Sequence, residues 1–187
     1  METVTSRGMS RPPKVLKSES IYSGRVISLI KDTVALPSGR TVIREKVMHP
    51  GSVGILPVLE DGGLVLIKQF RYVVGSNLFE IPAGTIEEGE SPEECAVREL
   101  REETGYQAGR LTPLSAFYLA PGYSNEFMWL FKATELEAGA IRPMPDESIE
   151  VRRFGLNEVL QMIRSGEIRD VKTICAILLY ALLEKVR

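Results

Sequence analysis

Residues 84–106 read GTIEEGESPEECAVRELREETGY, a glycine-rich turn followed by a segment dense in glutamate. Ser91, then Pro92, then Glu94 three residues after the serine predict a helix that begins with a capping box and has proline in its first turn. Gly105 predicts the end of this helix, because glycine readily adopts the left-handed conformation of a C-cap. The segment therefore predicts one turn and one helix, with well-marked ends.

The predicted helix carries three carboxylates on one side. Because a helix turns once per about 3.6 residues, Glu99, Glu102 and Glu103 fall within an arc of roughly 100°. Their charges repel one another, and a hard divalent cation such as Mg²⁺ relieves the repulsion because it prefers oxygen ligands. The alternative is a solvated acidic face with pairs to arginine, such as Arg98 with Glu102 one turn away.

The segment resembles the Nudix box, Gly-x5-Glu-x7-Arg-Glu-U-x-Glu-Glu-x-Gly-U, in which U is a bulky apolar residue. The matching positions are Gly84, Glu90, Arg98, Glu99, Leu100, Glu102, Glu103 and Gly105. Tyr106 departs from the usual aliphatic residue but still fills an apolar position. The resemblance implies a Nudix hydrolase, with the α/β fold of that superfamily: a three-layer α/β/α sandwich around a mixed sheet.

The resemblance also implies a metal site. The expected ligands are Ala83, Glu99, Glu102 and Glu103. Ala83 has no side-chain donor, so its part is implied for the backbone carbonyl alone. Mg²⁺ is the expected ion, with Mn²⁺ as an alternative, because divalent ions neutralise phosphate oxygens and lower the pKa of bound water. Glu90 and Arg98 are expected to orient the helix and the ligands.

In the ADP-ribose branch of the superfamily, which the chain resembles, a glutamate in a loop beyond the box often activates the attacking water. Residues 143–150 read PMPDESIE, and Glu147 is the predicted base because Glu150 lies where a strand is expected to begin. Glu150 and a box glutamate remain alternatives. The catalytic candidates are Glu147, Glu102 and Glu103.

Two segments before the box point to a substrate class. Lys-Gln-Phe-Arg-Tyr at 68–72 and Glu-Ile-Pro-Ala-Gly at 80–84 resemble the branch that acts on ADP-ribose and nucleoside diphosphate sugars. Arg71 is expected to grip a phosphate through its planar guanidinium, although alone it is equally consistent with a surface arginine. Glu80 is expected to hold a ribose hydroxyl or shape the site, and Arg44 to contact the base or support a dimer.

Pro121 lies sixteen residues after Gly105, a spacing that resembles the ADP-ribose pyrophosphatase signature. The implied role is a rigid loop over the terminal sugar, with hydroxyl contacts from Ser124 and Glu126. An ordinary tight turn is the alternative. Tyr123 complicates the assignment, because an aromatic residue near this offset also resembles dinucleoside polyphosphate hydrolases.

Composition limits the function classes. A chain of 187 residues with 44% apolar residues can form one globular domain with a full core. The net charge of −2 provides no field for nucleic acid or anionic lipid, and there is no long apolar run for a membrane span. The start of the chain lacks the apolar stretch of a signal peptide. Its two cysteines are expected to be buried thiols, which suits the cytoplasm.

Three regions are expected: a flexible tail at 1–13, an N-terminal antiparallel β-sheet at 14–47 and a Nudix hydrolase domain at 48–187. Within them, strands are predicted at 15–19, 25–34, 41–47, 51–59, 64–70, 114–119, 127–133 and 149–154. A turn is predicted at 37–40, and the strands around residues 60–63 are expected to form a central hairpin. Residues 135–148 are expected to be mostly loop. A short helix capped by Asn157 and a final helix capped by Asp170 complete the chain.

The predicted activity is metal-dependent cleavage of the diphosphate bond of ADP-ribose or a related nucleoside diphosphate sugar, giving a nucleoside monophosphate and a sugar phosphate. A hydrolase of dinucleoside polyphosphates or other nucleotide diphosphates is one alternative. A non-catalytic nucleotide-sugar sensor is another, although such proteins usually lose box carboxylates. A homodimer through residues 14–47 is expected, because sheets of this kind in the family often cross to a second subunit; folding back on its own domain is the alternative.

Overall fold

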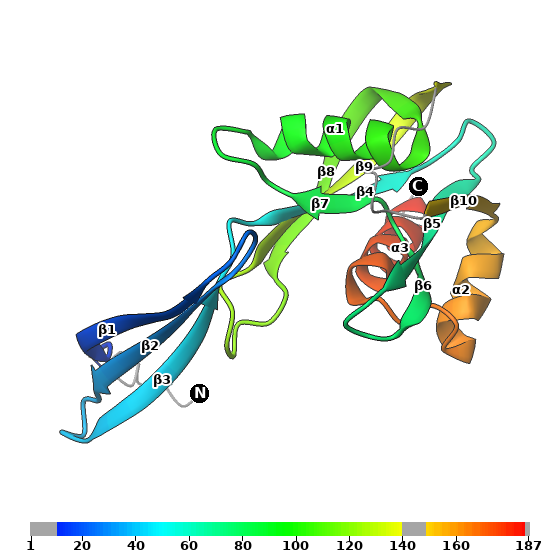
Figure 1. The fold of residues 1–187 in the computed structure, drawn as a ribbon. Coiled ribbons are helices and arrows are strands. Elements are labelled where there is room, and N and C mark those ends of the chain that lie inside the picture. The colour runs from blue at the N-terminus through cyan, green and yellow to red at the C-terminus, as the bar shows by residue number, and fades with distance from the viewer. Residues whose placement is uncertain (1–10, 140–148, 186–187) are drawn as a thin grey trace, which may run out of the picture. The chain divides into compact units, whose positions relative to one another are not determined.

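The computed structural model describes residues 11–139 and 149–185, which form two compact units. The N-terminal unit comprises the described residues up to His49 together with Ala120–Glu126, and the second comprises Pro50–Leu119 and the described residues from Phe127 onward. The elements in chain order (Figure 1) are β1 (Lys14–Ser23), β2 (Ser28–Ala35), β3 (Thr41–Met48), β4 (Ser52–Pro57), β5 (Leu64–Arg71), β6 (Ser76–Glu80), β7 (Ala83–Thr85), α1 (Pro92–Thr104), β8 (Tyr106–Tyr118), β9 (Phe127–Ala138), β10 (Ile149–Phe154), α2 (Leu156–Ser165) and α3 (Val171–Lys185).

The N-terminal unit is an antiparallel sheet in the order β1-β2-β3, as expected for this region. The predicted turn between β2 and β3 is confirmed, since the Gly39 N–H donates to the Leu36 carbonyl at 2.9 Å. The predicted strand start at residue 25 is wrong: residues 24–27 form a reverse turn closed by the Gly24 N–H and the Ile27 carbonyl, and β2 begins only at Ser28.

Residues 120–126 belong to this unit because they bind the end of β3. The Val47 N–H donates to the Tyr123 carbonyl at 2.8 Å, and the Asn125 N–H donates back to the Val47 carbonyl at 3.2 Å. The Asn125 side chain also accepts the His49 N–H at 2.7 Å. This loop, predicted to lie over a sugar, is therefore tied to β3 by backbone and amide hydrogen bonds.

The second unit contains two sheets and all three helices. A mixed sheet has the order β7-β4-β9-β8, in which β4 and β9 are parallel, and an antiparallel sheet has the order β10-β5-β6. Helix α1 covers one face of the mixed sheet, and α2 and α3 lie on the other side (Figure 1). The predicted α/β/α architecture is confirmed, with its strands divided between two sheets.

The predicted central hairpin of β4 and β5 is wrong. The turn exists, since the Leu59 N–H donates to the Gly63 carbonyl at 2.8 Å, but only one bridge, Val58 with Leu64, follows it. Strand β4 has β7 and β9 on its two edges, and β5 has β6 and β10. Because both edges of each strand are occupied, the two strands separate after the turn and enter different sheets.

Strand β4 explains why the layers form. It is buried along its whole length, as is typical of strands with parallel partners and helices on both faces. Val53 and Ile55 enter a cluster with Leu100 of α1, whereas Leu56 enters a second cluster with Ile177 of α3. The alternation of side chains along one strand therefore joins both helical layers.

The predicted ends of α1 and the Asp170 cap are confirmed. The Ser91 hydroxyl accepts the Glu94 N–H, the Glu94 side chain accepts the Ser91 N–H, and Gly105 has φ of 76°. Asp170 accepts the Thr173 N–H at 3.0 Å at the start of α3. The Asn157 cap is wrong: α2 begins two residues earlier than expected, at Leu156, and Gly155 is its N-cap.

Strands β8 and β9 are longer than expected. They pair from Tyr106 with Ala138 to Tyr118 with Phe127, so residues 135–138, expected as loop, are strand. A register shift between Pro113 and Ser115 and the many half-exposed positions of β8 interrupt the alternation that would have marked it. None of the helices within residues 11–139 and 149–185 has the length and apolar character that a bilayer span requires.

Replacing Ser91 with alanine should lower the free energy of unfolding by about 1 kcal/mol, because the first-turn N–H of Glu94 loses its acceptor. Ser91→Asp keeps an N-cap acceptor and should stay within a few tenths of a kcal/mol of the original chain. Urea unfolding followed by circular dichroism measures both. Equal midpoints for Ser91→Ala and the original chain would show that the capping box adds nothing.

Candidate active site

The short strand β7 brings the turn before α1 against the helix. Its Gly84 pairs with Val53 of β4, and the Glu99 side chain lies directly over it. A Cβ atom on Gly84 would lie 1.8 Å from a carboxylate oxygen of Glu99, far closer than atoms can approach. The first glycine of the motif therefore leaves room for the Glu99 side chain against the strand, and its backbone is not in the left-handed region.

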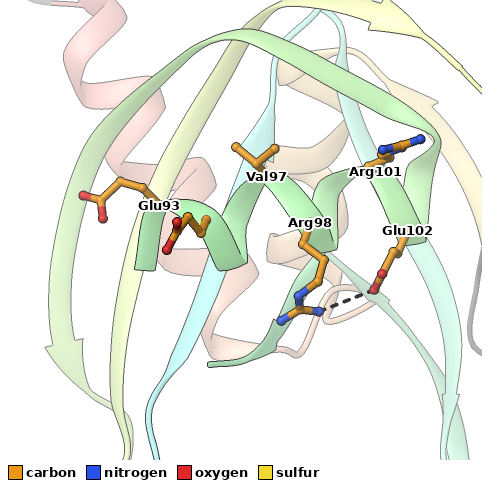
Figure 2. Close-up of a pocket in the computed structure, with 6 residues that line it drawn as sticks. Glu93, Val97, Arg98, Arg101 and Glu102 are labelled. Atoms are coloured by element: carbon orange, nitrogen blue, oxygen red, sulfur yellow. Dashed lines mark hydrogen bonds and ion pairs between the residues drawn. The ribbon is translucent and has the colours of Figure 1, made fainter. Parts of the chain in front are cut away.

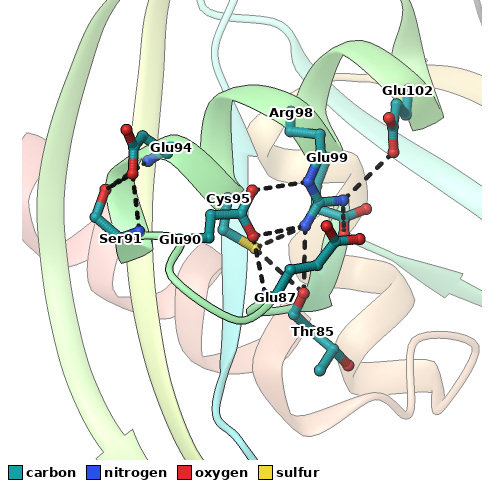
Figure 3. Close-up of polar contacts among 9 residues, drawn as sticks. All are labelled: Thr85, Glu87, Glu90, Ser91, Glu94, Cys95, Arg98, Glu99 and Glu102. Atoms are coloured by element: carbon teal, nitrogen blue, oxygen red, sulfur yellow. Dashed lines mark hydrogen bonds and ion pairs between the residues drawn. The ribbon is translucent and has the colours of Figure 1, made fainter. Parts of the chain in front are cut away.

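Arg98 is the centre of the polar contacts on α1 (Figure 3). Its Nε and Nη2 donate to the two oxygens of Glu90 at 2.8 and 2.9 Å, a bidentate pair. Its Nη1 donates to Glu99 at 2.6 Å and to Glu102 at 3.4 Å. Nη2 also contacts the Thr85 carbonyl at 3.3 Å. One guanidinium therefore connects three box carboxylates with the strand beneath them.

The surroundings of Arg98 shift the pKa values of three groups: Glu90, Arg98 itself and Cys95. Hydrogen bonds from Arg98 lower the pKa of Glu90 from 4.5 to about 2. The same pair raises the pKa of Arg98. Burial raises the pKa of the nearby Cys95 thiol, so this cysteine stays protonated near neutral pH. The Glu90–Arg98 pair is therefore ionised at every physiological pH.

Glu103 has a different environment from the other box carboxylates. Its side chain is buried, with 3% of the residue exposed, and its Oε2 accepts the Ala83 N–H at 2.9 Å. Glu102 is more open, with 36% of its side chain exposed. The structure thus brings Ala83, Glu103 and, through Gly84, Glu99 together at the junction of β7 and α1.

The donor chemistry of this junction fits a hard divalent cation, because partly buried carboxylate oxygens are the ligands such ions prefer. Among residues 11–139 and 149–185, however, no group of three or more His, Cys, Asp or Glu side chains is arranged as a metal cluster. Glu99 and Glu102 are instead paired with an arginine, since Arg98 Nη1 contacts both of them. The alternative expected from the sequence, arginine pairs along an acidic face, is therefore present. A cation at Glu99 would compete with Arg98 for the same carboxylate.

Arg71 and Glu80 form a second ionic pair at the ends of β5 and β6. Arg71 Nε and Nη2 each donate to one Glu80 oxygen at 2.8 Å. Lys172 also contacts Glu80, of which only 1% is exposed. Burial acts to raise the pKa of Glu80, but the hydrogen bonds from Arg71 and Lys172 outweigh it and lower that pKa. The guanidinium edge expected to grip a phosphate bidentately therefore faces Glu80.

Sequence reasoning did not identify Lys172 or Thr173, and it identified Asp170 only as a helix cap. Lys172 Nζ lies 2.9 Å from Asp170 as well as contacting Glu80. The Thr173 hydroxyl accepts the Ile81 N–H at 2.8 Å. A buried lysine and threonine at a helix start carry no local pattern that distinguishes them from surface residues.

The remaining predicted site residues lie in the N-terminal unit or outside the described residues. Arg44 is exposed on β3, where it contacts the Ile43 carbonyl at 3.3 Å. Pro121 is exposed in a turn, and the Ser124 hydroxyl accepts the Glu126 N–H at 3.1 Å. Glu147 lies outside the described residues. The alternative base, Glu150, is in β10 and pairs with Arg152. The substrate roles of these residues stay predictions.

A pocket of about 570 Å³ opens on the outer face of α1 (Figure 2). Its lining residues are Glu93, Glu94, Val97, Arg98, Arg101 and Glu102. Arg98 and Glu102 therefore belong both to the box contacts and to the wall of this pocket. A small ligand in such a space would lie beside the charged network rather than inside a closed cavity.

The Glu90–Arg98 pair should make stability depend on acid. Because the pKa of Glu90 is lowered to about 2, its contribution to stability is complete above about pH 4.5 and is lost as pH falls toward 2. Glu90→Gln should therefore lose less stability between pH 5 and pH 3 than the original chain, with urea midpoints as the measurement. Glu88→Gln, at an exposed position of the same turn, should keep the original pH dependence. Equal acid dependence for Glu90→Gln and the original chain would contradict the pairing.

The comparisons with known proteins agree with this geometry. The family model described as NUDIX domain matches residues 48–176. The chain is 43% identical to the ADP-ribose pyrophosphatase of Bacillus subtilis (strain 168) and 39% identical to the methanol dehydrogenase activator of Bacillus methanolicus; each match covers 88% of this chain and 90% of the relative. A solved structure described as an ADP compounds hydrolase superposes with a TM-score of 0.85 over 95% of this chain and 97% of that one, at 24% identity, and supports the fold. The chain belongs to the NUDIX family.

Proposed function

We propose that this protein hydrolyses the diphosphate bond of ADP-ribose or a related nucleoside diphosphate sugar, releasing a nucleoside monophosphate and a sugar phosphate. The observation that carries the proposal is the complete box, of which Glu99 and Glu103 lie where α1 meets β7. The relative from Bacillus subtilis, named ADP-ribose pyrophosphatase, supports the substrate class. A binding protein without activity would not need every box carboxylate.

NUDIX hydrolases depend on divalent metal ions. For this chain we propose Mg²⁺, with Mn²⁺ as an alternative, held by Glu99 and Glu103 with help from Glu102 and the Ala83 carbonyl. When bound, such an ion neutralises phosphate oxygens and lowers the pKa of attacking water. The protein's part is to hold the ligands: Gly84 lets Glu99 approach the strand, and the Ala83 N–H fixes Glu103.

Proton transfer and substrate binding are assigned to the residues expected from the sequence. Glu147 is the proposed base, with Glu150 or a box glutamate as alternatives. Glu90 and Arg98 orient the acidic helix through their bidentate pair. The proposed substrate contacts are Arg44, Arg71, Glu80, Pro121, Ser124 and Glu126. For Arg71 a phosphate contact would have to share the guanidinium with Glu80, which occupies Nε and Nη2.

The full chain incubated with ADP-ribose and Mg²⁺ should produce AMP and ribose 5-phosphate, separated by ion-exchange chromatography. Glu103→Gln should reduce turnover by about 10²-fold or more with the fold retained, because it removes a buried ligand charge at the junction. Glu88→Gln should retain activity, since this residue is exposed before α1.

Each alternative has its own outcome in the same assay. Intact ADP-ribose and intact nucleotide sugars across a panel would refute the proposed function. Cleavage of dinucleoside polyphosphates instead would favour the second hydrolase class. Binding of ADP-ribose without turnover by the original chain would favour the sensor.

We also propose a homodimer formed through the N-terminal sheet and a cytoplasmic location. The sheet has apolar side chains that are half exposed or more: Val15, Leu16, Ile21, Tyr22 and Ile43. Such a surface is typical of an interaction site. The cytoplasmic location is supported by the two cysteines, both free thiols, which suit a reducing compartment.

Light scattering should give about twice the chain mass of 20.8 kDa. Ile43→Asp should shift the protein toward monomer, because it replaces one of the exposed apolar side chains of the N-terminal sheet by a charge. Gln107→Asp, exposed on β8 of the second unit, should leave the mass unchanged. A monomeric mass for the original chain would refute the dimer.

A further inference from the structure

The first turn of α3 holds the segment that joins β6 to β7. This segment is hydrogen-bonded at three consecutive residues. The Ile81 N–H donates to the Thr173 hydroxyl at 2.8 Å, the Pro82 carbonyl accepts the Ile55 N–H at 2.9 Å, and the Ala83 N–H donates to Glu103 at 2.9 Å. The bond from Thr173 therefore lies two residues before the one that fixes Glu103.

The Thr173 hydroxyl has a fixed orientation. Thr173 is fully buried, and its Oγ1 donates to Asp170 Oδ2 at 2.5 Å. Because that proton is committed to the carboxylate, the oxygen lone pairs are directed to the Ile81 N–H. Asp170 is itself held by the Thr173 N–H at 3.0 Å. The hydroxyl thus connects the start of α3 to the backbone of Ile81.

Lys172 connects the first turn of α3 to Glu80, the residue before Ile81. Its Nζ contacts Glu80 and lies 2.9 Å from Asp170, and Arg71 completes the set. Two cations and two anions balance in this network, in which Glu80 is buried and Arg71 is partly exposed. Because Lys172 contacts both Glu80 and Asp170, the network ties the start of α3 to the residue before Ile81.

We propose that Thr173 is a positioning residue of the NUDIX site, supported by Asp170 and Lys172. It fixes the backbone of Ile81 and thereby sets where Ala83 meets Glu103 at the proposed metal site. Ligands shifted by a fraction of an ångström bind a metal ion less well, because coordination tolerates little displacement. The catalytic part of this inference rests on the proposed function, whereas its metal-binding part can be measured without turnover.

The test compares Thr173→Val, Thr173→Ser and the original full chain by Mn²⁺ titration, with free Mn²⁺ followed by electron paramagnetic resonance. Thr173→Val keeps the side-chain shape but leaves the Ile81 N–H and Asp170 without the hydroxyl, and should weaken Mn²⁺ binding about 5-fold or more. Thr173→Ser keeps the hydroxyl and should bind within about 2-fold of the original chain. With ADP-ribose, Thr173→Val should lower kcat and raise the Mg²⁺ concentration for half-maximal activity, with KM for ADP-ribose little changed.

Ile177→Val is the matched control. Ile177 is fully buried one turn further along α3, in the same apolar cluster as Ile81, and its truncation removes one methyl group from this core while leaving the hydrogen bonds of residues 81–83 in place. It should bind Mn²⁺ like the original chain. Asp170→Asn provides a second variant that keeps side-chain size, and it should weaken Mn²⁺ binding in the same direction as Thr173→Val.

The outcomes separate this inference from the proposed function. Unchanged Mn²⁺ binding in Thr173→Val, or in Asp170→Asn should Thr173→Val not fold, would overturn the positioning role. Equal weakening in Ile177→Val would overturn it too, because general destabilisation would then explain the loss. If the original chain binds no Mn²⁺, the inference fails with the metal site. If it binds Mn²⁺ but cleaves no nucleotide sugar, only the proposed function fails, and the comparison of variants still decides the positioning role.

Discussion

The structure of the site depends on one cation placed among like charges. Arg98 donates to Glu90, Glu99 and Glu102, so that carboxylates which would repel one another share a single guanidinium. The pairing with Glu90 is bidentate and only partly exposed, which makes it stronger than a surface ion pair. Without this arginine, Glu90, Glu99 and Glu102 would lose the hydrogen bonds that offset their mutual repulsion.

The positions of the charged residues follow from the layers beneath them. Strand β4 directs alternate side chains to α1 and to α3, so both helices rest on one buried strand. The segment between β6 and β7 passes between these two helices and is bonded to both, through Thr173 on α3 and Glu103 on α1. The site is therefore built where a loop is held from two sides, which gives a loop the rigidity of the surrounding elements.

Local features of this structure could be predicted from the sequence. Ser91, Pro92 and Gly105 mark the ends of α1 because capping chemistry involves only neighbouring residues. The box could be assigned for the same reason, since its spacing lies within one turn and one helix. Strand partners could not: β4 and β5 flank a good turn, but their partners β9 and β10 come from far along the chain.

Part of the site was likewise hidden from sequence reasoning. Lys172 contacts Glu80, and Thr173 contacts Ile81, only because α3 returns to the end of β6 after about ninety residues, and no spacing along the chain indicates these contacts. Gly84 was recognised as a motif position, but its reason, the Glu99 side chain lying on it, needed three-dimensional structure. Residue types and their spacing thus indicated which side chains could bind a metal ion, whereas the contacts that hold those side chains in place depend on long-range packing.

The guanidinium of Arg98 has a consequence for folding in the absence of a bound ion. Many metal-binding domains acquire their shape only when the ion arrives, because an empty cluster of acids drives itself apart. Here Arg98, which lies on the same helix as Glu99 and Glu102, supplies the opposite charge. Part of the acidic charge of α1 is therefore neutralised within the helix itself, so the fold does not need a divalent ion to hold these carboxylates near one another.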